Sequence, residues 1–438
     1  MNSKKMITIE ALINAPIEQV WKYWNTPEHV VKWNAASNDW HTPKAENDFR
    51  KGGKFIYRME AKDGSFGFDF GGVYEEVKTN ETISFRMDDG RSVKITFAKI
   101  GNTTKIVESF EAESTNPIEM QKNGWQSILN NFKKYAEGSQ KIIPHIWYDK
   151  EAKEAAKFYI SIFPNSKITN ISRINDTPSG DCDIVSFELN GHKFTSISAG
   201  PYFKLNPSIS FMLNFDPNRD KNARKNLEVL WTKLSEGGKA LMPLGKYPFS
   251  ELYGWVQDKY GVSWQLILTN PQGEERPFII PSTMFVGNFC GKAEEASNFY
   301  MSIFKNSKRG VIARYPKGME PDKEGTIMFT DFMLEGQWFV AMDSAHKHDF
   351  AVNEAISFIV ECEDQKEIDY YWEKLSAFKE AEQCGWLKDK YGVSWQIIPK
   401  QMNQMMTNAT KEQMTRLTKA FLQMKKFDLA QLKKAYES

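Results

Sequence analysis

Residue types that commonly carry catalysis or bind metal ions are sparse in this sequence of 438 residues, which has six histidines and four cysteines. It contains no HExxH motif, no recognisable Ser/His/Asp machinery and no glycine-rich phosphate loop. One short segment has histidines close in sequence to carboxylates, but without a spacing that defines a metal site; it contains Asp343, His346, His348 and Asp349. We expect these four residues to lie in a solvated loop.

The charge balance narrows the range of partners. With 57 basic and 56 acidic residues the formal net charge is +1, and no Lys/Arg-rich run stands out. We therefore expect no nucleic-acid partner and no membrane partner, and favour a small-molecule ligand. The cysteines form no CxxC pair and no apolar segment is long enough to span a bilayer, which favours reduced thiols and a cytoplasmic location.

One stretch of the chain occurs twice. Residues 254–265 read GWVQDKYGVSWQ and residues 385–396 read GWLKDKYGVSWQ, so ten of twelve positions are identical. A repeat at such a long period means that one structural unit is used twice. The length of the chain agrees, because it predicts about three domains.

The residues before the repeats predict an α+β domain at 1–138. Residues 7–13 alternate as in a strand, and helices are expected from Pro16 to about residue 26 and over 28–33. Strands separated by Gly, Asp and Asn turns are expected at 53–60, 66–77, 82–87, 93–100 and 105–113. A final helix at 117–137 carries an apolar stripe, so this pattern predicts a space between a curled sheet and a long helix.

The repeated part divides into unit one at 141–270, unit two at 278–399 and a helical tail at 400–438. Each unit is predicted to contain two βαβββ modules. In unit one the first module has a strand at 142–148, a helix at 151–162 and strands at 167–174, 183–189 and 193–198. The tail is expected to form a methionine-rich helix over 402–424 and a short second helix, docked across one unit or across the joint between the units.

Three segments of the first domain resemble one known family. They are APIEQVWKYWNTPEHVVKW at 15–33, DFRKGGKF at 48–55 and NGWQSILNNFKKY at 123–135, and they are similar to the activator of heat-shock protein 90 ATPase homologue-like family. That family belongs to the START-related helix-grip (SRPBCC) superfamily, so the resemblance implies a hydrophobic cavity. The residues expected to line it are Trp33, Trp40, Arg50, Phe68, Phe70, Phe85 and Trp125. Arg50 would orient an anionic end of a ligand; the alternatives are plain core for the aromatic residues and a surface ion pair for Arg50.

The repeated units resemble a second family. FYxSIFxNSK at 158–167 and 299–308, together with GWxxDKYGVSWQ, is similar to the PhnB-like (3-demethylubiquinone 3-methyltransferase-like) family of the vicinal oxygen chelate superfamily, which includes glyoxalases. The resemblance implies tandem units that pack as an intramolecular pseudo-dimer. Methyl transfer is not implied by the residues, because the βαβββ pattern has no glycine-rich nucleotide-binding turn.

Metal-dependent members of that superfamily bind a divalent ion through inward-facing strand residues. The corresponding positions here are expected to be His145 and Val286 on the first strands, Ser210 and Ser357 on the strands opening the second modules, and Gln265 and Gln396 on the last strands. Val and Ser do not anchor a divalent ion, and neutral Gln is a weaker ligand than a carboxylate. We therefore expect no metal in unit two and at most half a site in unit one, with His145 and Gln265 as weak candidates.

These observations favour a protein that binds an apolar or amphipathic small molecule and needs no cofactor. His145, Ser210, Gln265, Ser357 and Gln396 are then pocket-lining residues. Two alternatives stay open: a metal-dependent lyase, isomerase or dioxygenase acting through His145 and Gln265, and a co-chaperone-like ATPase regulator acting through the first domain.

Overall fold

The computed structural model describes residues 5–13, 15–37, 39–100, 103–136, 140–177, 179–270, 272–273 and 276–437. The chain divides into two compact units, Met1–Ser139 and Gln140–Ser438. Both combine helices and strands, as the α+β class requires. The expected joint at Gly138 and Ser139 lies outside the described residues, and the domain boundaries proposed from the sequence remain predictions.

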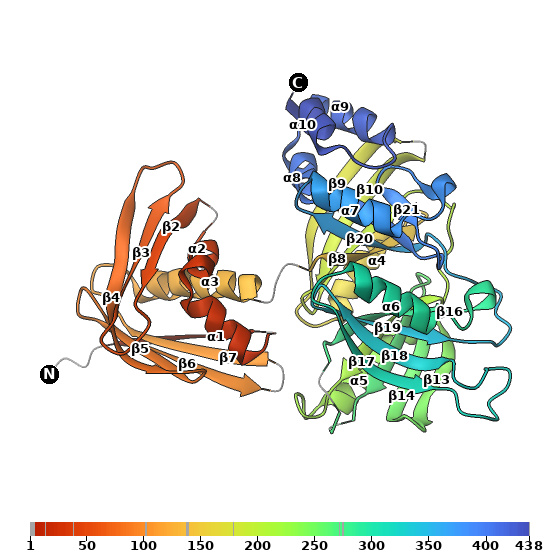
Figure 1. Cartoon of the computed structure of the whole chain (residues 1–438), viewed down its shortest axis with the longest axis horizontal. Helices are drawn as coiled ribbons and strands as arrows, with labels where there is room; N and C mark the ends of the chain where they lie inside the picture. Colours follow the sequence, from red (N-terminus) through yellow and green to blue (C-terminus); the bar gives the residue numbers. More distant parts are fainter. Residues whose placement is uncertain are drawn as a thin grey trace. The chain divides into compact units, whose positions relative to one another are not determined.

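The N-terminal unit is a seven-stranded antiparallel sheet covered on one face by helices (Figure 1). In chain order its elements are β1 (Met6–Ile13), α1 (Ile17–Asn25), α2 (Pro27–Trp33), β2 (Trp40–Asn47), β3 (Lys54–Ala61), β4 (Gly67–Lys78), β5 (Thr82–Met87), β6 (Ser92–Ile100), β7 (Thr103–Glu111) and α3 (Ile118–Ala136). The sheet order is β1-β7-β6-β5-β4-β3-β2. Alternate residues of β1, such as Ile9 and Ile13, are buried on the helix side, where they join Leu129 and Phe132 of α3 in one core. The predicted helix-and-curled-sheet arrangement is confirmed.

The strand β2 is absent from the sequence-based prediction. Most of its residues are polar, and it contains Pro43, whose nitrogen cannot donate a ladder hydrogen bond. The strand pairs only with β3, at the edge of the sheet, and Pro43 lies at an irregularity in that pairing, between His41 and Lys44. Edge strands of this composition carry little of the alternation on which prediction relies.

The C-terminal unit contains four modules in sequence. The first module consists of β8 (Ile142–Tyr148), α4 (Ala152–Ile162), β9 (Lys167–Thr177), β10 (Gly180–Leu189) and β11 (His192–Ser198), and the second of β12 (Ile209–Phe215), α5 (Ala223–Ser235), β13 (Lys239–Tyr247), β14 (Ser250–Gln257) and β15 (Ser263–Leu268). The third module consists of β16 (Ile279–Phe285), the short η1 (Gly287–Phe289), α6 (Ala293–Ile303), β17 (Lys308–Arg314), β18 (Ile327–Leu334) and β19 (Gln337–Asp343). The fourth module consists of β20 (Ile356–Cys362), α7 (Gln365–Leu375), η2 (Lys379–Ala381), β21 (Trp386–Lys388) and β22 (Ser394–Pro399). The first three have the predicted βαβββ order.

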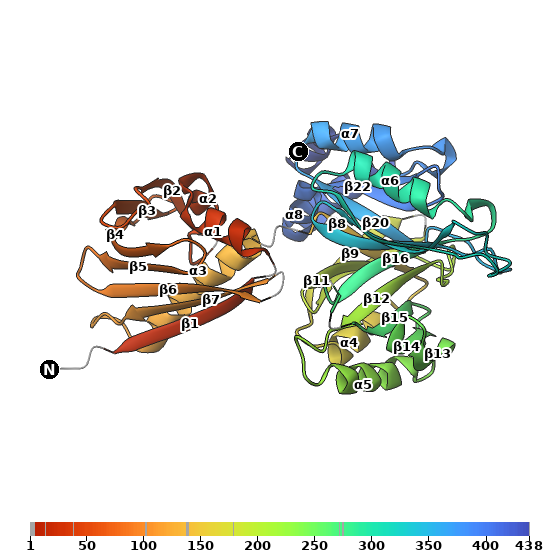
Figure 2. The same ribbon diagram turned by 60° about the horizontal axis from the view of Figure 1, so that its bottom comes forward.

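The four modules build two sheets, and each sheet takes strands from both halves of the repeat. One sheet has the order β21-β22-β20-β8-β11-β10-β9 and the other has the order β13-β14-β15-β12-β16-β19-β18-β17. Antiparallel pairing of β20 with β8, and of β12 with β16, joins the halves. Figure 2 shows α6 and α7 on one side of these sheets and α4 and α5 on the other. Neither sheet is complete without both halves.

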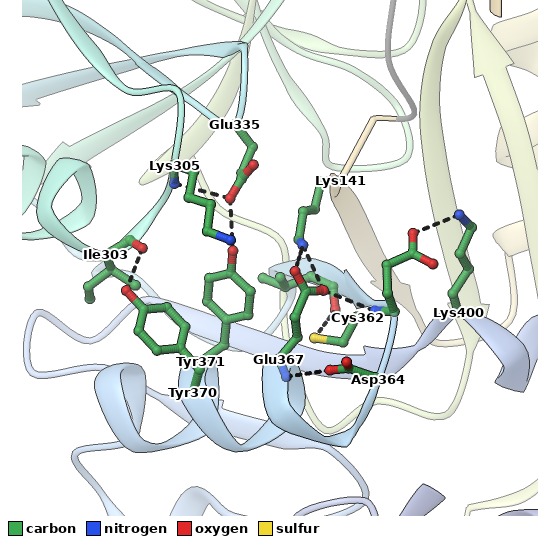
Figure 3. Close-up of polar contacts among 12 residues, drawn as sticks. Lys141, Ile303, Lys305, Glu335, Cys362, Asp364, Glu367, Tyr370, Tyr371 and Lys400 are labelled. Atoms are coloured by element: carbon green, nitrogen blue, oxygen red, sulfur yellow. Dashed lines mark hydrogen bonds and ion pairs between the residues drawn. The ribbon is translucent and has the colours of Figure 1, made fainter. Parts of the chain in front are cut away.

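Polar contacts reinforce the joint between the first strand and the last module (Figure 3). The Nζ atom of Lys141 lies 2.7 and 2.8 Å from the two carboxylate oxygens of Glu367 on α7. On the same helix Tyr371 donates to Glu335 Oε1 at 2.8 Å, and Tyr370 donates to the carbonyl oxygen of Ile303 at 2.8 Å. The helix α7 is thereby held to segments from both halves of the repeat.

The fourth module departs from the predicted pattern, because η2 stands where a strand preceding β21 was expected. The tail shields this shortened edge: the backbone N–H groups of Cys384 and Gly385 donate to the carbonyl oxygens of Met424 and Lys425 at 2.8 and 2.7 Å. A covered edge cannot pair with another chain.

The tail forms three helices where two were expected: α8 (Lys400–Asn408), α9 (Lys411–Leu422) and α10 (Leu429–Glu437). The predicted helix over 402–424 is interrupted at Thr410, whose side chain and Gln413 form a capping box that starts α9. Met402, Met405 and Phe421 pack with Ile174 of β9, so the tail docks on a sheet that contains both halves, as expected.

All four cysteines are free, as expected. No helix in the described part of the chain has both the length and the apolar character needed to cross a bilayer.

Candidate functional site

The N-terminal unit contains a cavity of about 260 Å³ between the sheet and α3. Aromatic and aliphatic side chains make up most of its wall, and Arg91 and Glu108 are the charged residues among those that line it. Small-molecule sites in proteins are apolar hollows of this kind, with a few polar groups that orient the ligand. The cavity is therefore the leading candidate site in the described part of the chain.

Five of the seven wall residues proposed from the sequence line this cavity: Trp33, Phe68, Phe70, Phe85 and Trp125. Trp125 of α3 stacks on Phe110 of β7 with ring centroids 4.1 Å apart, which fixes its position beside the cavity. Other residues line the cavity that the sequence did not single out as wall residues, among them Trp24, Asn25, Asn34, Tyr57, Ile83 and Ile128. That these residues contact a ligand remains a prediction.

Trp40 and Arg50 are not among the lining residues. The ring of Trp40, on the edge strand β2, lies beside the ring of Phe66, which precedes β4, and the ring of Phe68 on β4. The Arg50 side chain is 73 % exposed and forms an ion pair with Asp48 at 2.9 Å. Because Arg50 lies in the turn between β2 and β3, its side chain extends into solvent, and the expectation that it orients a ligand in the cavity is wrong.

Glu108 is the acidic group of the cavity, and the sequence-based prediction missed it. On β7 it lies directly between Ile9 of β1 and Ile95 of β6 in the pairing register, and its side chain is only 5 % exposed. It has no hydrogen-bonding or ion-pair partner among the described residues. Burial raises the pKa of this carboxyl to about 8.

A signal for Glu108 is present in the sequence. Residues 105–111 read KIVESFE, and a period of two places Glu108 on the same face as Ile106 and Phe110. Ile106 and Phe110 are both fully buried. A carboxyl on the core face of a strand is an exception to the usual distribution of polar residues, and such exceptions mark sites.

Arg91, the basic residue of the wall, is already engaged. Its Nη2 lies 2.7 Å from Asp89 Oδ2, and its Nη1 donates to the carbonyl oxygen of Glu111 at 3.3 Å. The guanidinium is therefore held at the β5–β6 turn by partners other than Glu108. The acidic side chain of the wall, Glu108, therefore remains without a partner among the described residues.

The sheet containing β8 places three of the predicted residues together. His145 of β8 lies opposite Ser357 of β20, with Nδ1 and Oγ 3.5 Å apart, and Gln396 of β22 donates to the same hydroxyl at 2.9 Å. The ring of Trp386 meets the His145 ring edge to face at 5.4 Å. Burial lowers the pKa of His145 to about 3, so this imidazole is neutral at physiological pH.

The other sheet places Ser210 and Gln265 together. The Nε2 atom of Gln265 donates to Ser210 Oγ at 2.8 Å, and the hydroxyl of Tyr253 donates to Gln265 Oε1 at 2.7 Å. His145 and Gln265, predicted together as at most half a metal site in unit one, thus belong to different sheets. The physical reason is the exchange of strands between the halves, which puts His145 beside Gln396.

The counterpart of His145 in unit two is Ser282, whereas the sequence-based alignment pointed to Val286. Ser282 lies opposite Ser210 in the pairing of β16 with β12, just as His145 lies opposite Ser357. The residues Ile-Ile-Pro precede both His145 and Ser282, and this tripeptide was the available signal. Val286 follows the end of β16.

The repeated GWxxDKYGVSWQ stretch forms the last hairpin of each half. Asp389 accepts four hydrogen bonds: from the hydroxyl of Tyr300 at 2.8 Å, from the indole of Trp395 at 2.8 Å, and from the backbone N–H groups of Tyr391 and Val393 at 2.8 and 3.1 Å. Asp258 has the matching four donors: Tyr159, Trp264, Tyr260 and Val262. Each aspartate thereby ties the hairpin of one module to the helix of the other module in that half.

Comparison with protein-family models agrees with this geometry. A model described as 3-demethylubiquinone-9 3-methyltransferase matches residues 140–267 and 278–398, which is more than half of the chain. The chain belongs to this family. A second model, described as Activator of Hsp90 ATPase homolog 1-like protein, matches residues 14–137, so the N-terminal unit is an AHSA1-like domain. No curated protein matches the chain.

Solved structures similar to single domains of this family member include three from bacteria. An AHSA1-like protein from Aeromonas hydrophila is 47 % identical over 30 % of this chain and 92 % of its own, with a TM-score of 0.30. Chr148 from Cytophaga hutchinsonii is 57 % identical over 30 % of this chain and 91 % of its own, with a TM-score of 0.28. A PhnB protein from Bacillus cereus is 36 % identical over 30 % of this chain and 100 % of its own, with a TM-score of 0.27.

The divalent metal implied by the resemblance to vicinal oxygen chelate enzymes does not fit the residues of this family member. The amide oxygen of Gln265 already accepts from Tyr253, and the residues beside His145 are a serine and a neutral glutamine. Among the described residues, no group of three His, Cys, Asp or Glu side chains is placed to hold a metal ion. Divalent ions are bound most firmly by imidazoles and anionic ligands together, and neither cluster supplies such a set.

Proposed function

We propose that this protein binds a small apolar or amphipathic molecule in the cavity of its AHSA1-like domain. The observation that carries the proposal is a cavity of about 260 Å³ whose wall combines apolar side chains with the unpartnered carboxyl of Glu108. A structural core of this size would be filled, because protein interiors are packed to the density of organic crystals. A ligand would fill the space and give Glu108 a partner.

We further propose that the PhnB-like half acts without a divalent metal, as a pair of units packed into an intramolecular pseudo-dimer. Gln265 donates to Ser210 in one sheet and Gln396 donates to Ser357 in the other, and the hairpin aspartates hold the modules together. Both features favour a structural role for residues that align with metal ligands in other members of the superfamily. We therefore place ligand binding in the first domain, where Glu108 lines the cavity.

The proposal is tested by binding of N-phenyl-1-naphthylamine, a neutral dye whose fluorescence rises in apolar surroundings, to the full chain. Ile128 of α3 lines the cavity and is partly buried, so Ile128→Trp fills the space from the helix side without changing the sheet. The matched control is Met120→Trp, since Met120 lies on the same helix and is 64 % exposed.

We expect the wild-type chain to bind one dye molecule, Ile128→Trp to bind at least about tenfold more weakly, and Met120→Trp to bind like the wild type. Circular dichroism checks that both variants fold. Dye binding that is unchanged in Ile128→Trp, or the absence of dye binding by the wild-type chain, would rule out this cavity as the site.

A further inference from the structure

We propose that the ligand of the AHSA1-like domain is a hydrophobic organic cation, whose positive charge pairs with the carboxylate of Glu108 inside the aromatic cavity. This inference rests on the proposed function, because it names the chemical class of the molecule bound at the same site. The inference is carried by the lack of a partner for Glu108 among the described residues and by the aromatic rings of the cavity wall.

The neighbours of Glu108 in the sheet offer it no polar partner. Ile9 on β1 and Ile95 on β6 are directly opposite Glu108, and they are 2 % and 1 % exposed. From the helix, Trp125 and Ile128 face the same cavity. A buried carboxyl without a hydrogen-bonding or ion-pair partner is an unfavourable arrangement that proteins keep where it serves a site.

The titratable and charged groups of the cavity wall are Tyr57, Tyr74 and Arg91, besides Glu108 itself. Burial raises the pKa of Tyr57 to about 12 and raises that of Tyr74 further, so both remain neutral phenols over the physiological range. The charge of Arg91 is directed to Asp89. Glu108 is thus the one group in the wall that can gain or lose a charge near neutral pH without a resident partner.

The aromatic rings of the wall favour a cation over a neutral or anionic ligand. Trp24, Trp33, Phe55 and Phe85 all line the cavity, and their ring faces carry negative electrostatic potential that attracts cations. A carboxylate inside an aromatic wall is the combination that recognises ammonium groups, because the ring faces replace water while the carboxylate balances the charge. At a pH where Glu108 is ionised, an anionic ligand would instead meet a like charge in a site of low dielectric constant.

Binding of a cation is expected to be linked to the loss of one proton from Glu108. Burial keeps this carboxyl protonated up to a pKa of about 8 in the empty cavity, and pairing with a permanent cation requires the ionised form. The affinity for such a cation should therefore rise about tenfold per pH unit between pH 6 and pH 8, and level off above. The affinity for a neutral molecule of the same shape should not change.

The test uses phenyltrimethylammonium and its uncharged isostere tert-butylbenzene, each competing with N-phenyl-1-naphthylamine on the full chain. Glu108→Gln removes the charge and keeps the shape of the side chain. The matched control is Glu119→Gln, which removes a charge from an exposed position on α3. Measurements run from pH 6 to pH 9, and circular dichroism checks the fold of each variant.

At pH 9 we expect the wild-type chain and Glu119→Gln to prefer phenyltrimethylammonium over tert-butylbenzene at least about tenfold, and Glu108→Gln to lose this preference while still binding tert-butylbenzene. Equal competition by the two probes, or a cation affinity that does not vary with pH in the wild-type chain, would overturn the inference while leaving the proposed function intact. The pH profile of the wild-type chain decides the question even where Glu108→Gln does not fold. Failure of the dye itself to bind would instead overturn the proposed function.

Discussion

Two buried carboxyls, Glu108 in the first domain and Asp389 in the PhnB-like half, lie in opposite surroundings. Asp389 is fully buried and accepts four hydrogen bonds, and its pKa is raised by burial, against the effect of those donors, to about 6. Glu108 is 5 % exposed and has no partner among the described residues, and burial raises its pKa to about 8. The same chemical group is a structural clamp where donors converge on it and a candidate ligand anchor where none do.

The difference separates the roles of the two halves of the chain. In the PhnB-like half, Gln265 donates to Ser210 and Gln396 donates to Ser357, so these polar side chains are engaged with one another. In the first domain the polar group and the space around it remain available. Measurements that remove one carboxyl at a time therefore test this distinction.

The largest effect is expected from Asp389→Ala. The substitution leaves the Tyr300 hydroxyl, the Trp395 indole and two backbone N–H groups buried without an acceptor, and we expect the free energy of unfolding of the PhnB-like half to fall by about 3 to 5 kcal/mol. Urea unfolding followed by tryptophan fluorescence measures the loss. Asp349→Ala, at an exposed position, is the control and should change stability by less than about 0.5 kcal/mol. A similarly small effect of Asp389→Ala would contradict its role as a clamp.

The opposite sign is expected for Glu108→Gln. The pKa of Glu108 is about 8 in the folded state, above the usual 4.5 of the unfolded chain. As the pH rises from 4.5 to 8, the unfolded chain loses this proton while the folded chain keeps it, so the stability of the folded state falls. Removing the carboxyl should therefore stabilise the first domain by roughly 2 to 4 kcal/mol at pH 8, with little gain at pH 4.5. Thermal unfolding at several pH values gives the comparison, with Glu119→Gln as the matched control. Destabilisation at pH 8 would mean that Glu108 has a partner in the folded protein.

A smaller effect is expected at His145. The pKa of His145 is about 3 in the folded state and 6.5 in the unfolded chain. As the pH falls below 6.5, the unfolded chain binds a proton that the folded chain does not, so the folded state loses stability. At pH 5 this costs about 2 kcal/mol, which His145→Gln should remove. Urea unfolding of the two proteins at pH 5 and pH 7.5 measures the change. His346→Gln, whose side chain is 61 % exposed, should keep the acid sensitivity of the wild type; the same acid sensitivity in His145→Gln would argue against a buried neutral imidazole.

The smallest effect is expected from metal ions. Neither polar cluster offers a ligand set for a divalent ion, so adding Zn²⁺ or Mn²⁺ to EDTA-treated protein should shift the melting temperature of the PhnB-like half by less than about 1 °C. A saturable rise in melting temperature at micromolar metal would show that one of the clusters rearranges to bind the ion.

Local patterns in the sequence predicted most of the elements and part of the site. The alternation of β1 and the spacing in α3 predicted the space in which Trp33, Phe85 and Trp125 lie. Arg50 was misplaced because its position in a turn, rather than its charge, decides where the side chain points. Glu108 was overlooked even though the period of β7 places it on the core face.

The remaining errors concern pairing between distant segments. Both halves of the repeat contribute strands to each sheet, so His145 meets Ser357 and Gln396 from the other half. No pattern within one module encodes this exchange, because the paired strands β8 and β20 lie far apart in the sequence. The counterpart of His145 was misassigned for a simpler reason: the offset between repeats drifts, and the local tripeptide before Ser282 was not used.

Native mass spectrometry of the full chain, purified without added ions and then mixed with phenyltrimethylammonium at pH 9, tests the division of roles most directly. We predict one bound cation per wild-type chain, loss of that cation in Glu108→Gln, and no stoichiometric divalent metal in either protein. A stoichiometric metal ion would contradict the structural role of the PhnB-like half, and a cation retained equally by Glu108→Gln would contradict the role of Glu108 as the anchor of the ligand.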